Sequence, residues 1–312
     1  MFLSLYDFFN PAGSSGEVIT KIGVTWQYWL PVILSLIALA CLFIFKTGYV
    51  KLAQNKLFLR ILGIFQIFLY FLYYFLHFLY LYYFKESGKN LRGWPWIFPF
   101  HLSSITQIIS GILLIKANDK LFSITAPWVV IMVFASLLIP ADKLYGPQHF
   151  SYWLYYVLHV IIIFTYWFLY MYGIVQYHRD YLLWSFISLI IFSLMALSFN
   201  ALSLIIAKNE NEITNLLFIG RNGYPLWGSG NNLVTTTTNI FDRTGRLWPL
   251  GYIFIFAFGI FFTSLGYLIL TKVQPYYLQK GNKFVPLKRV KQPWDFKALG
   301  IMFKNIKTIF KK

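Results

Sequence analysis

The chain has 312 residues and a formal net charge of +17, because 27 Lys and Arg residues face only 10 Asp and Glu. It is 58% hydrophobic and only 12% charged, about half the charged fraction of a typical soluble domain. This composition excludes a soluble globular, disordered or collagen-like chain. The single cysteine, Cys41, excludes an intrachain disulfide and a cysteine-rich metal site. The sequence therefore predicts an all-α polytopic membrane protein.

Seven apolar stretches are long enough to cross a hydrocarbon core of about 30 Å as helices. They are continuous rather than alternating, which excludes the strands of a barrel. Lys and Arg between the stretches number 18 on the side of the C-terminus and 9 on the other side, which predicts an outer N-terminus and a cytoplasmic C-terminus. The stretches are Thr25–Phe45, Phe58–Phe84, Ile97–Ile115, Leu121–Pro140, Phe150–Gly173, Tyr181–Ala207 and Pro249–Thr271.

These stretches predict that the chain has a large membrane domain and a short tail. Residues 1–272 form a seven-helix membrane domain, in which residues 208–248, rich in Gly, Asn and Thr, form an outer cap loop. Residues 273–312 form a basic cytoplasmic tail with prolines in its first half and an amphipathic helix at its end. We expect this helix to bind the anionic inner leaflet, with a partner membrane protein as the alternative. Nucleic acid is not expected, because no recognition module accompanies the basic charge.

Polar side chains inside the predicted spans are the candidates for chemistry, and none of the ten acids is among them. Ser103 and Gln107 lie four residues apart on one helix face, and His149 and His159 belong to one stripe of the fifth span. A serine nucleophile needs a base, and histidine is the usual one. The alternative is that these groups only bond backbone or neighbouring helices. The other notable candidates within the spans are His77, His101 and Asn200.

Three segments resemble the YwaF-like integral membrane proteins, which are related to the transmembrane protein 164 acyltransferases. They are WPWIFPFHLSS (Trp94–Ser104), the stretch from Pro140 through GPQHFSYWLYYVLH to His159, and NIFDRTGRLWPLGY (Asn239–Tyr252). The resemblance implies a seven-helix fold and, from the eukaryotic branch, acyl transfer between glycerophospholipids through a cysteine and a histidine. The cysteine position falls on Ser103. The histidine positions fall on His101, His149 and His159, and the Asp and Trp–Pro positions on Asp242, Trp248 and Pro249.

We therefore predict a lipid acyltransferase or lipid-ester hydrolase of the bacterial plasma membrane, without metal or cofactor, that acts on membrane phospholipid. The predicted catalytic residues are Ser103, His101, His149 and His159, and the predicted substrate-binding residues are Gln107, Asn200, Asp242 and Trp248. We expect the polar groups to line one cavity that opens toward the side of the N-terminus, under the cap loop. Two alternatives stay open: a non-catalytic lipid-binding or scaffolding subunit, and a small-molecule transporter or sensor.

Overall fold

The computed structural model describes residues 26–83, 102–138, 147, 150–206, 251–273, 276–279 and 283–286, and most of these are helical. Each predicted apolar stretch overlaps a helix, and the ends of α6 lie within two residues of the prediction. The elements are α2 (Trp26–Ile44), α3 (Lys46–Gln54), α4 (Lys56–Tyr83), α5 (Leu102–Ile115), α6 (Asp119–Leu138), α7 (Phe150–Met171), η3 (Arg179–Tyr181), α8 (Leu182–Ile206), α9 (Gly251–Lys272), β1 (Tyr276–Gln279) and β2 (Lys283–Pro286).

Several of these helices are long and apolar enough to cross a membrane. Within the described residues four qualify alone, in α2, α6, α7 and the run from η3 into α8, and the bent pair α3–α4 adds a fifth. The described parts of α5 and α9 are shorter apolar helices. The prediction of a helical membrane protein is thus confirmed, while the number of seven spans and the orientation of the termini stay predictions.

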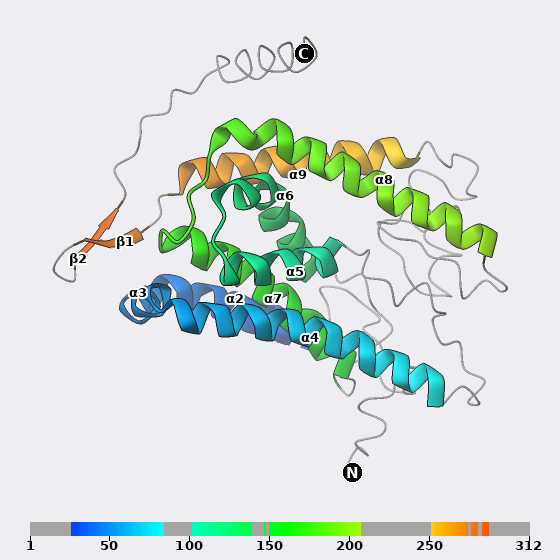
Figure 1. Ribbon diagram of the computed structural model, residues 1–312, viewed down its shortest axis with the longest axis horizontal. Helices are drawn as coiled ribbons and strands as arrows, with labels where there is room; N and C mark the ends of the chain where they lie inside the picture. The colour runs from blue at the N-terminus through cyan, green and yellow to red at the C-terminus, as the bar shows by residue number, and fades with distance from the viewer. Residues whose placement is uncertain are drawn as a thin grey trace, which may run out of the picture.

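The helices pack around α6 and α7. Helix α6 contacts α7, α8 and α9, whereas α7 also contacts α2 and α5, and α5 packs along α4. In Figure 1, α8 and α9 lie on one side of α6, and α2, α4 and α7 lie on the other. The buried centre includes Phe122, Val129, Tyr166 and Leu169. The outer faces of α2 and α4 expose large apolar side chains, as expected of helices that face lipid.

Tyrosine hydroxyls join the helices through backbone carbonyls. Tyr155 donates to Ser136 at 2.6 Å, and Tyr170 donates to Leu270 at 2.7 Å, in each case across to another helix. Four of the five acceptors of this set lie in the last turn of a helix, where carbonyls lack a partner within their own helix, and the fifth, Gln27, lies four residues before Pro31, which has no N–H to donate. A hydrogen bond between membrane helices contributes about 0.6 kcal/mol on average. The other members of this set are Tyr28 to Leu138, Tyr152 to Gln27 and Tyr172 to Leu42.

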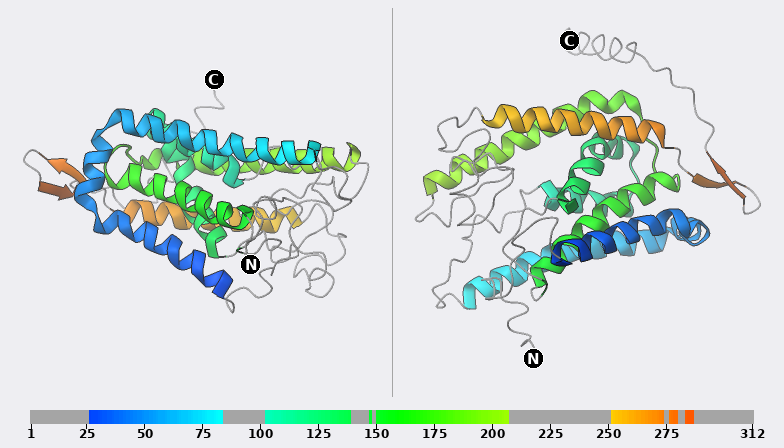
Figure 2. Two further views of the ribbon diagram at one scale, coloured as in Figure 1. Left: turned by 90° about the horizontal axis from the view of Figure 1, so that it is seen from below. Right: turned by 180° about the vertical axis from the view of Figure 1, so that it is seen from behind.

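Helix α3 is a feature that the sequence did not predict. It meets α4 at a bend of 91° and lies across one end of the bundle between α2 and α4 (Figure 2). Asn55 starts α4 after the bend, because its Oδ1 accepts the backbone N–H of Phe58 at 3.0 Å. The ring of Tyr49 packs against Phe164 and Phe168 of α7, which anchors α3 to the bundle. The segment between the first two predicted spans, for which no helix was predicted, therefore contains a helix that lies across the end of the bundle.

The start of the C-terminal tail also differs from the expectation. Instead of a segment broken by prolines, β1 and β2 form an antiparallel hairpin in which Tyr276 pairs with Pro286 and Gln279 with Lys283. Pro286 stands at the end of its strand, where a missing N–H disturbs the ladder least. The amphipathic helix expected near the C-terminus lies outside the described residues.

Helices α6 and α9 approach each other closely at Gly266. A Cβ atom there would overlap the backbone carbonyl of Pro127. Glycine thus lets the two backbones touch, the usual arrangement where membrane helices pack without a hydrophobic driving force.

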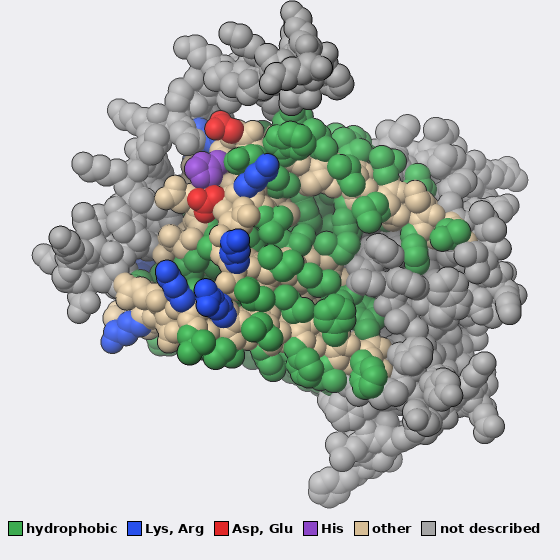
Figure 3. Space-filling model, viewed as in Figure 1, with side chains coloured by type: hydrophobic (Ala, Val, Ile, Leu, Met, Phe, Trp, Pro, Cys, Tyr) green, Lys and Arg blue, Asp and Glu red, His purple; other side chains and the backbone are tan. Residues whose placement is uncertain are grey.

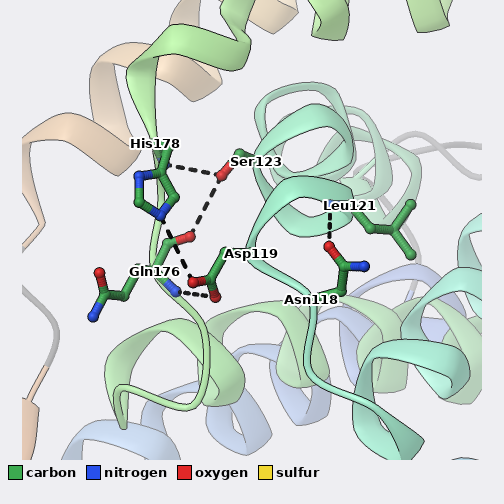
Figure 4. A network of polar contacts seen from close by, with 6 residues as sticks. All are labelled: Asn118, Asp119, Leu121, Ser123, Gln176 and His178. Carbon is green, nitrogen blue, oxygen red and sulfur yellow. Dashed lines mark hydrogen bonds and ion pairs between the residues drawn. The ribbon is translucent and has the colours of Figure 1, made fainter.

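Charged side chains gather at the end of the bundle that carries α3. In the described helices and their connections all eight Lys and Arg and both Asp lie at this end, and Figure 3 shows the basic groups there beside an otherwise apolar face. A polar network joins the start of α6 to the connection between α7 and α8 (Figure 4). Asp119 accepts the backbone N–H of Gln176 at 2.9 Å, and the backbone N–H of His178 donates to Ser123 at 2.9 Å.

Candidate functional site

Helices α4 and α5 approach each other more closely than any residue larger than glycine would allow at the point of contact. The candidate site lies along this contact. Gly63 and Gly111 face each other, so that a Cβ on Gly63 would lie 2.5 Å from the carbonyl oxygen of Gly111. Such small residues let two membrane helices run side by side at short range. The polar side chains that follow along this contact are therefore held between two backbones. We call this line of polar side chains the α4–α5 seam.

The inner part of the seam is a closed hydrogen-bond network. Gln66 of α4 donates through Nε2 to the hydroxyl of Ser110, which donates to the carbonyl of Gln107 at 2.8 Å. Gln107 returns a bond from its Nε2 to the carbonyl of Gln66 at 3.1 Å, and Thr165 of α7 donates to Gln66 Oε1 at 3.5 Å. All four side chains are buried. The network satisfies polar groups that hydrocarbon would leave costly and fixes the register of α4, α5 and α7.

The outer part of the seam contains three hydroxyl groups. Tyr74 and Ser104 are hydrogen-bonded at 3.1 Å. The ring of Tyr70 lies 4.8 Å from that of Tyr74, and its hydroxyl lies near the Tyr74 and Ser104 hydroxyls. Yet the Tyr70 hydroxyl is fully buried and has no partner of acceptable hydrogen-bond geometry among the described residues. A buried phenol without a partner loses its hydration without compensation, so this position is costly unless something else binds there.

Ser103 lies beside this hydroxyl group, in the first described turn of α5. Its side chain is partly exposed, and its carbonyl accepts a bond from Thr106 at 2.8 Å. Gln107, predicted to share its face, points into the seam. The structure therefore brings Gln107 together with Gln66, Ser110 and Thr165, and it leaves Ser103 at the rim of the same group.

His159 is buried in the middle of α7. Its Nδ1 lies 2.6 Å from the carbonyl of Tyr155, and because a carbonyl only accepts, this nitrogen carries the proton. The second ring nitrogen of a neutral imidazole then has a free lone pair, the state that a general base needs. The imidazole ring lies 4.2 Å from the ring of Tyr155, whose hydroxyl bonds Ser136 of α6.

The direction of His159 differs from that of the seam. Thr165, which reaches Gln66, follows His159 by six residues, so the two side chains leave α7 about 120° apart. Tyr155 and Tyr166, which both bond α6, lie within about 40° of His159. Among the described contacts His159 thus belongs to the α6 side of α7, and pairing of its imidazole with Ser103 stays a prediction.

The other predicted site residues fall where less is described. His77 and Asn200 belong to the outer parts of α4 and α8, but their side chains are not described. Within the described residues no group of three or more His, Cys, Asp and Glu could hold a metal ion. The predicted site residues that lie outside the described residues are His101, His149, Asp242 and Trp248.

Six residues of the seam were missed from the sequence. The three residues on α4 could have been identified from the sequence, because Gln66, Tyr70 and Tyr74 recur every four residues and therefore share one helix face. Gln66 is also an amide within an apolar stretch of the kind that usually marks a functional or packing site. The full set is Gln66, Tyr70, Tyr74, Ser104, Ser110 and Thr165.

Comparison with known proteins gives one result. A sequence model of the TMEM164 family matches residues 23–267, which include every described helix from α2 to α8 and most of α9. No similar protein was found among those with curated annotation, and no similar chain among solved structures.

Proposed function

The chain belongs to the TMEM164 family of membrane proteins, and from this premise we propose that it transfers or hydrolyses fatty-acyl esters of membrane lipids. The observation that carries the proposal is the α4–α5 seam, where Ser103 lies beside the hydroxyls of Tyr70, Tyr74 and Ser104 in an apolar bundle. Lipid esters are apolar molecules with a polar carbonyl, and the seam offers hydroxyls beside lipid-facing surface.

The reaction would begin at the Ser103 hydroxyl. Its oxygen attacks the acyl carbonyl while a histidine takes the proton, and the tetrahedral intermediate collapses as the lipid alkoxide leaves with that proton. The acyl-serine then gives its acyl group to a lipid hydroxyl, which is transfer, or to water, which is hydrolysis. His101, His149 and His159 are the candidate bases. His149 and His101 come first, because His159 leaves α7 on the same side as Tyr155 and Tyr166, which bond α6.

The proposal also includes an orientation of the chain in the membrane. We place the end with α3 in the cytoplasm, because all Lys and Arg of the described helices lie there. The seam then opens toward the outer half of a plasma membrane crossed by seven helices, and residues 208–248 cover it. In this arrangement Asn200, Asp242 and Trp248 contact the lipid, and the basic tail binds the anionic inner leaflet.

A serine-directed fluorophosphonate probe tests the proposal in native membranes. We expect the full chain to be labelled and Ser103→Ala to be unlabelled. Ser136→Ala is the matched control, because Ser136 is a helix serine whose hydroxyl bonds its own backbone at Met132, away from the seam. Labelling that persists in Ser103→Ala, or that never occurs, would contradict the proposal. Substitution of each histidine by Gln then identifies the base by the lost rate of labelling.

A second function is favoured by the direction of His159. If no histidine reaches Ser103, the seam binds lipid without chemistry, and the chain is a lipid-binding or scaffolding subunit. Lipid that co-purifies with the unlabelled chain would favour this reading.

A further inference from the structure

We infer that the hydroxyls of Tyr70, Tyr74 and Ser104 form a binding site for the carbonyl oxygen of a lipid acyl ester. This site deepens the proposed function and rests on it for the role of Ser103, but the binding itself needs no reaction. It lies in the outer part of the seam, one turn beyond the closed network of Gln66 and Gln107.

A count of hydrogen-bond donors supports an acceptor as the ligand. The three hydroxyls supply three O–H donors, and the bond between Tyr74 and Ser104 uses one of them. Tyr70 lies near the Tyr74 and Ser104 hydroxyls but has no partner of hydrogen-bond geometry among the described residues, so its donor is left over in a buried place. The neighbouring closed network meets its polar needs within itself, which makes the unpaired phenol a local exception. A ligand that accepts hydrogen bonds, rather than one that donates them, completes this group.

The surroundings select an uncharged acceptor. The nearest charged side chain along α4 is Arg60, ten residues or about 15 Å from Tyr70. Along the described part of α5 and beyond its end the first is Lys116, twelve residues or about 18 Å from Ser104. A phosphate held here would face none of the described cations at short range, and a buried unpaired charge is far more costly than a neutral group. An ester carbonyl accepts hydrogen bonds and carries no charge, so it fits the unused donor of Tyr70.

Access and geometry agree with a lipid. The side chains of Tyr74 and Ser103 are partly exposed, while Phe71 and Phe75 beside them are 57% and 56% exposed on the lipid-facing side of α4. An acyl chain can lie along these rings while its carbonyl approaches the Tyr70 hydroxyl beside the bonded pair of Tyr74 and Ser104. Ser103 directly precedes Ser104 in the chain, so a carbonyl held at this site lies next to the proposed nucleophile, and the same donor would hold the oxyanion.

The test compares two lipids that differ only in the carbonyl. Dioleoyl phosphatidylcholine has acyl esters, and its dioleyl diether analogue has none. Binding to the full chain in detergent micelles is measured by native mass spectrometry, in a Ser103→Ala background so that no ester is consumed. We expect the ester to bind about three- to tenfold more tightly than the ether, the effect of one hydrogen bond. Tyr70→Phe should remove this preference.

The control is Tyr156→Phe. The hydroxyl of Tyr156 is also buried and has no hydrogen-bond partner within the part of the chain that the structure describes, but it lies near Tyr152 and Tyr28, at the contact of α2 with α7. Tyr156→Phe should keep the ester preference. Tyr70→Phe should also unfold no more readily than the background protein, because it removes only an unsatisfied group. This separates loss of binding from loss of fold.

Two results would overturn the inference: equal binding of ester and ether in the background protein, or an ester preference that survives Tyr70→Phe. Failure of the proposed function gives a different pattern. An ester preference that Tyr70→Phe abolishes, together with an unlabelled Ser103 in the unmodified chain, retains the carbonyl site and refutes the acyl-transfer chemistry.

Discussion

Gly63→Ala should open the α4–α5 seam, because no space exists for a methyl group at this position. The added Cβ would lie 2.5 Å from the carbonyl oxygen of Gly111, 2.8 Å from Ile115 Cγ1 and 3.0 Å from Leu114 Cβ. The first of these neighbours is backbone and cannot rotate away. The helices must therefore separate by at least about half an ångström to relieve the overlap.

The separation acts on the polar network one turn away. The bond from Gln107 Nε2 to the carbonyl of Gln66 measures 3.1 Å and would lengthen beyond hydrogen-bonding range. Overpacking of a tight contact costs about 1 to 3 kcal/mol. A lost hydrogen bond between membrane helices adds about 0.6 kcal/mol on average. We expect Gly63→Ala to lower the free energy of unfolding by about 2 to 4 kcal/mol in total.

Unfolding by sodium dodecyl sulfate in mixed micelles, followed by circular dichroism, measures this loss. Gly48→Ala is the control, because a Cβ at Gly48 in α3 meets nothing within 4 Å. That variant should be neutral or up to about 1 kcal/mol more stable, since alanine favours helix. If the midpoint of Gly63→Ala equals that of Gly48→Ala, the close approach of α4 and α5 is refuted, and with it the argument that the seam is held between two backbones.

Two further predictions concern other parts of the bundle. Gly266→Ala should cost about 1 to 3 kcal/mol in the same assay, because its Cβ would overlap the carbonyl of Pro127; it should leave the ester preference intact, and unchanged stability would show that α9 and α6 do not touch there. Burial, with Tyr267 alongside, raises the pKa of the Tyr177 phenol in the connection after α7, so the folded state favours the neutral form. The resulting stability is complete below about pH 10 and falls as the pH rises above it, at up to about 1.4 kcal/mol per pH unit. Alkaline unfolding should therefore be less steep in Tyr177→Phe, and equal pH profiles would contradict the burial of this hydroxyl.

The membrane helices could be predicted from the sequence because length and apolar content alone define them. Helix α6 was expected at Leu121–Pro140 and is observed at Asp119–Leu138. Helix α3 could not be predicted in this way, because its nine residues contain lysines and a glycine and it depends on the packing of Tyr49 against α7.

The candidate site was only partly visible for a similar reason. Gln107 was identified as an amide in an apolar stretch, but its partners Gln66 and Thr165 come from two other helices. Spacing within one helix says which residues share a face, and only packing decides which neighbour that face meets. The direction of His159 toward α6 illustrates this limit, because the stripe on α7 was predicted without knowledge of what it would contact.

In the hydrogen bonds from tyrosine hydroxyls to backbone carbonyls, only the tyrosine is restricted in residue type. Each acceptor is a main-chain oxygen, at Leu138, Ser136, Leu42, Leu270 or Gln27, and every amino acid that could replace these residues carries the same oxygen. The donor has no such freedom, because phenylalanine keeps the ring and loses the bond. Relatives of this chain can thus vary at the acceptor while they retain the tyrosine. Paired substitutions, the usual evolutionary trace of a contact between helices, would then be absent where these helices are joined most directly.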